Sequence, residues 1–551
     1  MMPHPGGPMG LLLSLVAASL AAAPALHAGD HADLVPVDGR FGHDTLWQSY
    51  LRYFEPELLP ADDAPPAMCA TSLLAAMEAE WDAFSAPEQE RILARVAPGV
   101  GAIHPRVPER SPPVAWSAAP PPPQEACFGE EAYGKAQVLK GTHFQLEYQA
   151  NTISADVAAD LLVELDATYE LQVGQLGWRV PTGSDRWLIP FYVVPGNQAS
   201  AFTTIYGCGG QQVPYIVAYS GSFFDDRWWR SMAAHEFNHA AQWGYGYAIE
   251  FWWWEATATY MQEYAHPDLD EWAPYITGYT DQPYVSLSAS DTADLDVFWH
   301  MYGMAIWNFW IDENYGGLPT ILAMWDASQG APGMNYGLTQ GEMMEDVGLD
   351  FDQVYAGFVA ANTVMDYRER AEMPDVDLED TVNDLPADGA SGLDAPQAYG
   401  QNYWRFDLRK PTGDRTDLEV VFTGDEPANW LVQLVGASAD QVETVVEMEV
   451  DGTAGTARLE GYGDYEQVFL VVSPRKETTG TFGFSWSAKG EPSLGTEDAD
   501  AAEAADELAA LDGDTLESGG CGCDTSAPAS VGWLGALGAV AVARRRRGIP
   551  A

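Results

Sequence analysis

Basic residues are scarce in this sequence of 551 residues: 26 Lys and Arg stand against 81 Asp and Glu, which gives a formal net charge of −55. A surface of that charge repels nucleic-acid phosphates and anionic lipids, so the composition excludes a nucleic-acid partner and suits a protein that acts outside the cell. The acidic surface could attract Ca²⁺, but no Asp-x-Asp-x-Asp-Gly loop supports a calcium site.

Long hydrophobic runs are also lacking, and two short ones lie near the ends of the chain. The first, Leu11–Ala23, falls within residues 1–28 and is followed by small residues at two candidate cleavage sites, after Ala25 and after Ala28. This pattern predicts a signal peptide, although the residues before the run include no Lys or Arg. The mature protein is then expected at the cell surface, at the outer membrane or in the medium.

The second short run, Val531–Ala543, lies between Cys521-Gly522-Cys523 and the four arginines Arg544–Arg547. It is shorter than the ~20 residues that a stable membrane-spanning helix needs. Residues 520–551 resemble the MYXO-CTERM tail of myxobacterial surface proteins, in which a Cys-containing motif precedes a hydrophobic segment and an Arg cluster. The resemblance implies that a sorting peptidase acts on this tail and that the chain meets a membrane only through it.

Cysteine is scarce as well, with five residues in the whole chain. Two belong to the tail, which leaves Cys69, Cys127 and Cys208 in the body of an exported chain, where disulfides can form. Three cysteines cannot all pair, and sequence alone does not fix the pairing. We predict a Cys69–Cys127 bridge. A cysteine of the front segment could instead cap a zinc ion, but a disulfide accounts for it as well and is favoured.

Changes in composition divide the chain into segments. Residues 29–123 have a helical pattern and end in a proline-rich linker, Pro112–Pro123, so they are a candidate propeptide. Residues 124–380 mix strand and helix patterns, residues 395–490 alternate short strands with turns, and residues 491–519 form an acidic linker. The predicted fold class is an α+β domain, with a mixed sheet and a helical part, followed by an all-β sandwich.

Periodicity also places the main elements. An amphipathic stretch predicts a helix from Ser154 to Trp178, and the pattern is mainly helical from Arg227 on. The predicted strands are Thr142–Tyr148, Trp187–Val194 and Val213–Tyr219 in the α+β part, and Asn402–Leu408, Asp417–Thr423, Trp430–Leu434, Thr444–Val450, Gly455–Glu460, Gln467–Val472 and Gly480–Trp486 in the sandwich.

The residues that carry chemistry begin at His235-Glu236-Phe237-Asn238-His239, an H-E-x-x-H motif. On a helix, residues four apart share a face, so His235 and His239 can bind one Zn²⁺ from the same side. Glu236 then lies beside the metal, where it can take a proton from a water molecule as a general base. The alternative is a His/Glu pair on a solvated helix, and the apolar neighbours argue against it.

A third metal ligand is expected on the next helix. Glu255 follows His239 by sixteen positions and stands directly after three tryptophans. Glu250, Glu263 and His266 are nearby alternatives, and we favour Glu255 over them.

The pattern of these residues resembles gluzincins, the zinc metallopeptidases in which H-E-x-x-H is followed by a Glu on the next long helix, and in particular secreted myxobacterial metalloproteases. The match is Glu255-x-x-Ala258, and it implies a zincin-like catalytic domain with one catalytic Zn²⁺. Metzincins fit less well, because Gln242 and Tyr245 stand where they need a Gly and a His or Asp. The chain also departs from better-known gluzincins, because Thr259 stands where a carboxylate often orients a zinc-bound His.

A donor for the transition-state oxyanion is also expected. Tyr302 is the first choice, at the head of a helix predicted to run to Asn314, because gluzincins of the aminopeptidase type place a Tyr similarly. His300 is the alternative, and either residue could simply pack. The tryptophans at 228, 229, 243 and 252–254 could line a substrate cleft, but most are expected to pack in the core.

These observations predict a secreted or surface-anchored zinc metalloendopeptidase that hydrolyses protein or peptide substrates, with Glu236 as the general base. The alternative is a catalytically inactive, zincin-like surface adhesin that binds through its β-sandwich and holds any zinc in a structural, four-ligand site. A third hypothesis assigns targeting to the sandwich and cleavage to the α+β domain.

Overall fold

The computed structural model describes most of the chain between residues 42 and 492. The described residues are 42–55, 58, 69–96, 126–127, 137–208, 211–245, 250–290, 295–328, 340–408, 416–475 and 480–492. The predicted signal peptide, the proline-rich linker, the C-terminal tail and nearly all of the acidic linker lie outside these residues. Within them, no helix is both long enough and apolar enough to cross a membrane.

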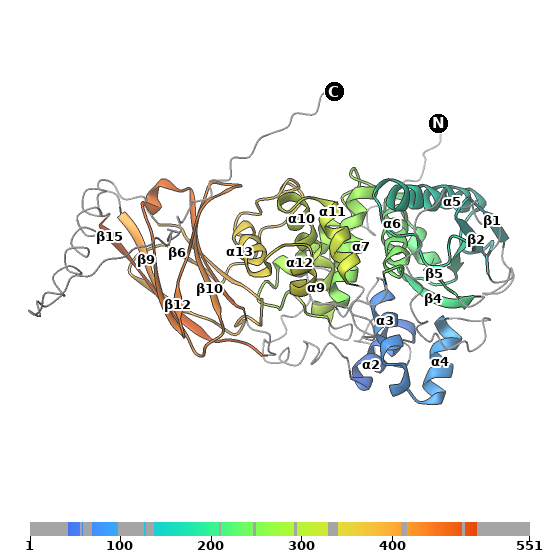
Figure 1. The fold of residues 1–551 in the computed structure, drawn as a ribbon, viewed down its shortest axis with the longest axis horizontal. Coiled ribbons are helices and arrows are strands. Elements are labelled where there is room, and N and C mark those ends of the chain that lie inside the picture. The colour runs from blue at the N-terminus through green and yellow to red at the C-terminus, as the bar shows by residue number, and fades with distance from the viewer. Residues whose placement is uncertain are drawn as a thin grey trace, which may run out of the picture. The chain divides into compact units, whose positions relative to one another are not determined.

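The front segment contributes three helices to the described structure. They are α2 (His43–Phe54), α3 (Thr71–Ala79) and α4 (Ala86–Val96). These helices pack on the sheet that follows and share its hydrophobic core (Figure 1). Tyr53 donates a hydrogen bond to the carbonyl of Ala201 at 3.2 Å, and Tyr215 donates one to the carbonyl of Val96 at 2.7 Å. The helical prediction for this segment is confirmed for the part that the structure describes.

A five-stranded mixed sheet follows. Its strands lie side by side in the order β1 (Gln137–Lys140), β2 (Phe144–Tyr148), β3 (Ile189–Val194), β5 (Gln211–Tyr219) and β4 (Ala201–Cys208). The three inner strands are parallel, and β1 and β4 pair antiparallel at the two edges. Helix α5 (Ala155–Tyr169) makes the crossover from β2 to β3, with a π-helical turn after it. The three predicted strands are β2, β3 and β5, whereas the two edge strands, β1 and β4, were not predicted.

The helical part begins after β5. Its helices are α6 (Asp226–Gln242), α7 (Phe251–Ala265), α8 (Thr277–Thr280), α9 (Leu295–Gly303), α10 (Ala305–Asn314), α11 (Leu318–Ala327), α12 (Gln340–Asp346) and α13 (Phe351–Ala361). Alanines on α6 and α7, among them Ala241, Ala256 and Ala258, are fully buried. Small side chains let two helix backbones approach closely, which brings the metal-binding motif to its neighbour.

Two five-stranded sheets form the β-sandwich. The first has the order β11 (Val442–Glu447), β10 (Trp430–Ala437), β14 (Gln467–Pro474), β8 (Asn402–Phe406) and β6 (Asp380–Val382), and the second has the order β12 (Val450–Asp451), β13 (Ala454–Leu459), β9 (Thr416–Gly424), β15 (Phe484–Pro492) and β7 (Ala387–Ala390). The predicted fold class, an α+β part followed by an all-β sandwich, is confirmed. All the described residues belong to one compact unit that ends at Ser493, so the internal domain boundaries stay predictions.

Strand β10 explains how the sandwich joins the helical part. All eight of its residues are buried, because both faces of the strand are covered. Val432 and Leu434 point into the sandwich core, whereas Leu431 and Val435 belong to the core of the helical part. A strand covered on both faces has a continuous hydrophobic sequence rather than an alternating one.

The disulfide prediction is wrong. Cys127 pairs with Cys208, with a Cα–Cα distance of 6.0 Å, and Cys69 is a free, buried cysteine. Ala126 bridges to Leu188 beside β3, which brings Cys127 to the end of the sheet where β4 finishes. The backbone N–H of Ala70 donates to Ala201 at the start of β4, and six strand residues lie between that point and Cys208, a span of roughly 23 Å.

The helix predicted from Tyr302 to Asn314 is interrupted, because α9 ends at Gly303 and α10 begins at Ala305. A Cβ at Gly303 would lie 2.4 Å from the backbone nitrogen of Tyr279 and 3.0 Å from the backbone carbon of Gly278. We therefore expect Gly303→Ala to lower the free energy of unfolding by about 2 kcal/mol or more, measured by chemical denaturation.

Gly341 in α12 provides the matched control, because a Cβ there would meet no atom within 4 Å. Alanine is the better helix former, so Gly341→Ala should leave stability unchanged or raise it by about 0.5–1 kcal/mol. Equal effects of the two substitutions would contradict the close approach of α8 and α9.

Candidate metal centre

Helix α6 carries the H-E-x-x-H motif. Its N-cap, Asp225, accepts hydrogen bonds from the backbone nitrogens of Arg227 (2.8 Å) and Trp228 (3.4 Å), which fixes where the helix begins. His235 and His239 follow one turn apart on its buried face. Their Nε2 atoms lie 3.1 Å from each other, so both imidazoles point at the same place.

Glu255 on α7 completes a set of three converging side chains. Its Oε2 lies 3.2 Å from Nε2 of His235 and 3.3 Å from Nε2 of His239, and its side chain is fully buried. None of the alternatives, Glu250, Glu263 and His266, belongs to this group in the described structure. Glu263 accepts a hydrogen bond from the Trp272 indole at 2.8 Å, and Nε2 of His266 lies 3.2 Å from a carboxylate oxygen of Glu164, near the other end of the helix.

A fourth ligand type joins the three. Within the described residues, Cys69, His235, His239 and Glu255 form one group whose ligand atoms all lie within 4.8 Å of one another. The thiol of Cys69 also donates to Oγ1 of Thr71 at 2.9 Å, and burial raises the pKa of this thiol well above its usual range. The sequence analysis considered such a cysteine cap but favoured a disulfide for Cys69, and the structure shows that this cysteine is free.

Hydrogen bonds on the far side of His239 fix the tautomer of its ring. Gln242 donates through Nε2 to Asn238 at 2.8 Å and to the carbonyl of Trp254 at 3.0 Å. Its Oε1 therefore faces Nδ1 of His239, 2.7 Å away, and must accept the Nδ1 proton. That leaves Nε2 of His239 with a free lone pair for a metal ion.

His235 is held in a comparable way by Gln262, whose amide lies 3.1 Å from Nδ1. The amide oxygen of Gln262 is buried and has no partner among the described residues. A half-turn of the amide lets this oxygen accept the Nδ1 proton, which leaves Nε2 free for a metal ion. Thr259, considered from the sequence for this supporting role, has a buried hydroxyl without a partner in the described structure.

Glu236 is 1 % exposed and lies next to the three converging side chains. Its Oε2 accepts a hydrogen bond from Oγ1 of Thr203 on β4 at 2.8 Å and one from Oγ1 of Thr71 at 3.5 Å. Burial raises the pKa of Glu236 above its ordinary value, although the nearby imidazoles oppose the shift. A carboxylate with a raised pKa binds a proton more readily, which is what a general base requires.

The pKa of the other buried carboxylate, Glu255, shifts in the opposite direction. Burial alone would raise the pKa of Glu255, but the attraction of His239 and His235 overrides it and holds the pKa well below its usual range. Glu255 is therefore a carboxylate at neutral pH. An ionised carboxylate and two imidazoles form a donor set that suits Zn²⁺.

Tyr302 reaches the site, and His300 does not. The ring of Tyr302 stacks on His235 with centroids 5.8 Å apart, and its hydroxyl donates to the backbone carbonyl of Cys69 at 3.3 Å. His300 donates from Nε2 to the carbonyl of Ser286 at 3.1 Å, and burial lowers its pKa to about 4. Residues two apart on a helix face nearly opposite ways, so only one of this pair can face the ligands.

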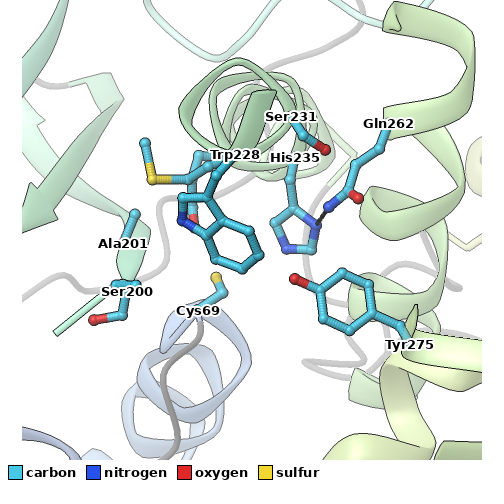
Figure 2. Close-up of a pocket in the computed structure, with 11 residues that line it drawn as sticks. Cys69, Ser200, Ala201, Trp228, Ser231, His235, Gln262 and Tyr275 are labelled. Carbon is cyan, nitrogen blue, oxygen red and sulfur yellow. Dashed lines mark hydrogen bonds between the residues drawn. The ribbon is translucent and has the colours of Figure 1, made fainter. Parts of the chain in front are cut away.

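A pocket opens beside the converging ligands. It is lined by Cys69, Ala199, Ser200, Ala201, Trp228, Ser231, Met232, His235, Glu236, Gln262 and Tyr275. Figure 2 shows the hydroxyl of Tyr275 directed toward His235 and the sulfur of Cys69 entering the same space. The sequence did not single out Tyr275, whose part of the chain carries no recognisable motif.

The tryptophans divide as expected. Trp229 and Trp252–Trp254 are buried in the core, whereas Trp228 is half-buried and lines the pocket. Its ring lies 6.0 Å from that of Phe224, which is 70 % exposed. Trp228 therefore lines the pocket with Phe224 packed beside it, and these two rings are called the aromatic rim here.

The group as a whole can hold a metal ion such as zinc. Two imidazole nitrogens, a carboxylate oxygen and a sulfur converge in a buried place, and each imidazole has an amide partner on its far side. Nitrogen and sulfur donors with one carboxylate are the ligands that Zn²⁺ takes in proteins.

Comparisons with known proteins add little to this geometry. No protein-family model matches the sequence, and no curated protein matches it. Among solved structures, 26 chains match, one of which is the pre-peptidase C-terminal domain of a collagenase from Bacillus anthracis. That likeness has 11 % identity and a TM-score of 0.15, and it covers 21 % of this chain and 100 % of that domain. A likeness at this TM-score says nothing about what the chain does.

Loss of Glu255 should weaken metal binding. After dialysis against buffered zinc, elemental analysis should find about one zinc per chain in the parent and clearly less in Glu255→Ala. Glu263→Gln is the control on the same helix and should keep its zinc. Equal zinc content in the parent and Glu255→Ala would show that the three converging side chains do not form the site.

The burial of Glu263 should make the stability of the fold depend on pH. Burial raises its pKa from 4.5 to about 7, and Trp272 only partly offsets this. The folded state therefore holds the proton more tightly than the unfolded state, and stability falls as pH rises from about 4.5 to 7. Glu263→Gln should be more stable than the parent at pH 8, by on the order of 1 kcal/mol after allowance for solvent screening, and equal to it at pH 4.5.

Chemical denaturation at the two pH values measures this difference, because other titrating groups contribute equally to both chains. The exposed Glu372→Gln is the control and should show no pH-dependent difference from the parent. A stability gain in Glu263→Gln that is the same at both pH values would contradict the assignment.

Proposed function

We propose that this chain is a zinc-dependent metallopeptidase that hydrolyses protein or peptide substrates. The observation that carries the proposal is the place of Glu236, a buried carboxylate beside three side chains that converge as metal ligands. A site built only to hold a metal has no need of a further carboxylate held by Thr203 next to the ligands.

The residues divide the chemistry between them. His235, His239 and Glu255 would hold Zn²⁺, which supplies Lewis-acid activation of water and of the scissile carbonyl when it is bound. Glu236 takes a proton from the attacking water and passes it to the leaving amine. Tyr302 and Tyr275 are the candidate donors to the oxyanion. Burial keeps the pKa of both hydroxyls well above the ordinary value, so each remains protonated at neutral pH.

The neighbouring edge strand favours an extended peptide as substrate. β4 lies at the end of the mixed sheet, and Thr203 on this strand contacts Glu236. An edge strand offers backbone donors and acceptors to a peptide that lies alongside it. The aromatic rim formed by Trp228 and Phe224 would then take an apolar side chain of the substrate.

Export is part of the proposal. The Cys127–Cys208 disulfide fits an oxidising compartment, which agrees with the predicted signal peptide. The predicted sorting tail would place the mature protein at the cell surface or release it into the medium, after action of a sorting peptidase. The tail is the only part for which we propose contact with a membrane.

The position of Cys69 favours a second candidate function. Structural zinc sites have four protein ligands, and here a sulfur stands beside the two imidazoles and the carboxylate. In that case the metal stabilises the fold, and the chain is an inactive surface protein that binds partners through its β-sandwich.

Glu236→Gln separates the two candidates. In the peptidase, this variant should retain zinc and lose about 10²–10⁴-fold in kcat/KM, because the amide cannot accept the proton. Activity is measured as cleavage of fluorescein-labelled casein. Because Cys69 lies against the metal ligands and could block the site, the purified chain is assayed both before and after limited proteolysis.

The matched control is Glu263→Gln, which makes the same chemical change at a residue away from the ligands. Its activity should equal that of the parent. If Glu236→Gln and the parent cleave equally well, the proposed mechanism is wrong. If neither chain cleaves after proteolysis while both hold zinc, the structural site is correct.

A further inference from the structure

The front segment does more than pack against the sheet, because a short stretch of it contacts several groups of the candidate site. This stretch, Cys69–Ser72, is called the plug here. It lies just before and at the start of α3, and its four residues are buried. Figure 2 shows its first residue, Cys69, with the sulfur in the pocket that Trp228 and His235 also line.

The plug occupies the place of a substrate along the edge strand. The backbone nitrogen of Ala70 donates to the carbonyl of Ala201 on β4 at 3.2 Å. Two residues farther along the strand, the backbone nitrogen of Thr203 donates to Oγ1 of Thr71 at 2.7 Å. These are the groups of β4 that an extended peptide would otherwise use.

The plug also engages the groups assigned to catalysis. Thr71 donates to Glu236, and Ser72 donates to Oε1 of Glu255 through its hydroxyl and, at 3.3 Å, through its backbone nitrogen. Tyr302 donates to the carbonyl of Cys69. The general base, a metal ligand and the candidate oxyanion donor are thus all occupied by neighbouring residues of one short stretch.

Charge and orientation favour Cys69 as a metal ligand. The thiolate of Cys69 and the carboxylate of Glu255 would together neutralise the two positive charges of Zn²⁺ in a buried site. The N-terminal end of α3 also directs the backbone N–H of Ser72 at Glu255, and the positive end of a helix stabilises nearby anions.

We propose that Cys69 is the fourth ligand of the metal and that residues 43–96 are an inhibitory segment that keeps the site closed until it is displaced. This inference rests on the proposed peptidase function and adds its regulation. On displacement the metal–sulfur bond breaks, the sulfur keeps the electron pair and takes a proton from solvent, and the vacated position becomes open to water.

The disulfide pattern is compatible with displacement. The described disulfide joins Cys127 to Cys208, so no described disulfide ties residues 43–96 to the sheet. A cut in the chain anywhere between Val96 and Ala126 therefore leaves this segment held by non-covalent contacts and the proposed metal–sulfur bond.

The first test uses the full chain loaded with Co²⁺ in place of zinc. A thiolate ligand gives a near-ultraviolet charge-transfer band, which the parent should show and Cys69→Ser should lack. The control is the double variant Cys521→Ser/Cys523→Ser, which removes the other thiols and should keep the band. A parent that binds Co²⁺ without this band overturns the proposal, whatever its activity.

The second test is activity on labelled casein. Cys69→Ser should cleave at least about tenfold faster than the uncut parent, because the population of open sites rises. If Cys69→Ser does not fold, a specific protease site inserted between Pro120 and Pro121 replaces it, and cutting should abolish the band and raise activity together. If the uncut parent cleaves casein as fast as Cys69→Ser or the cut chain does, the proposed inhibitory role of residues 43–96 is wrong.

Failure of the proposed function has a different signature. If the band is present in the parent and absent from Cys69→Ser, but neither this variant nor the cut chain cleaves, the inhibitory role and the peptidase function are both wrong. If the Cys69→Ser or cut chain cleaves and depends on Glu236, while the parent has no band, the peptidase function stands and only the role of Cys69 is wrong.

Discussion

Two carboxylates buried beside two imidazoles are the constraint on which this part of the structure depends. Glu236 and Glu255 are 1 % and 0 % exposed, and neither forms an ion pair with a Lys or Arg in the described part of the chain. Burying an unpaired charge is costly, and the aromatic side chains around the site offer little compensation. The two imidazoles stabilise the ionised form of Glu255 but do not offset the effect of burial on Glu236, and a divalent cation bound by the converging side chains would add positive charge beside both carboxylates.

Several features far apart in the sequence follow from holding this group together. Alanines bring α6 and α7 into contact, so that Glu255 reaches the two histidines. Gln242 joins the same two helices and sets the tautomer of His239. Gly303 lets α9 approach α8 and so brings Tyr302 against His235. The front segment closes the remaining side, where the sulfur of Cys69 completes a set of four donors.

The sequence predicted correctly those features that depend on residues close together in the chain. The spacing of His235, Glu236 and His239 is a property of one helix, and the alternating strands of the sandwich are visible one at a time. The fold class followed from these patterns and is confirmed. Strands β1 and β4 were missed, because both are edge strands whose places depend on the strands that they pair with. The disulfide was predicted wrongly, because the sheet, not the order of cysteines in the chain, brings Cys127 to Cys208. Cys69, Gln262 and Tyr275 reach the site only through tertiary packing, and no local pattern marks them.

The central claim is that the two histidines, Glu255 and Cys69 surround one zinc ion in the uncut chain. X-ray absorption at the zinc edge tests it most directly, because zinc–sulfur distances are longer than zinc–nitrogen and zinc–oxygen distances. We expect one sulfur at about 2.3 Å and three nitrogen or oxygen ligands at about 2.0–2.2 Å, with the sulfur replaced by a lighter atom after removal of residues 43–96. A spectrum with six oxygen or nitrogen ligands, or one without sulfur in the uncut chain, would contradict the account.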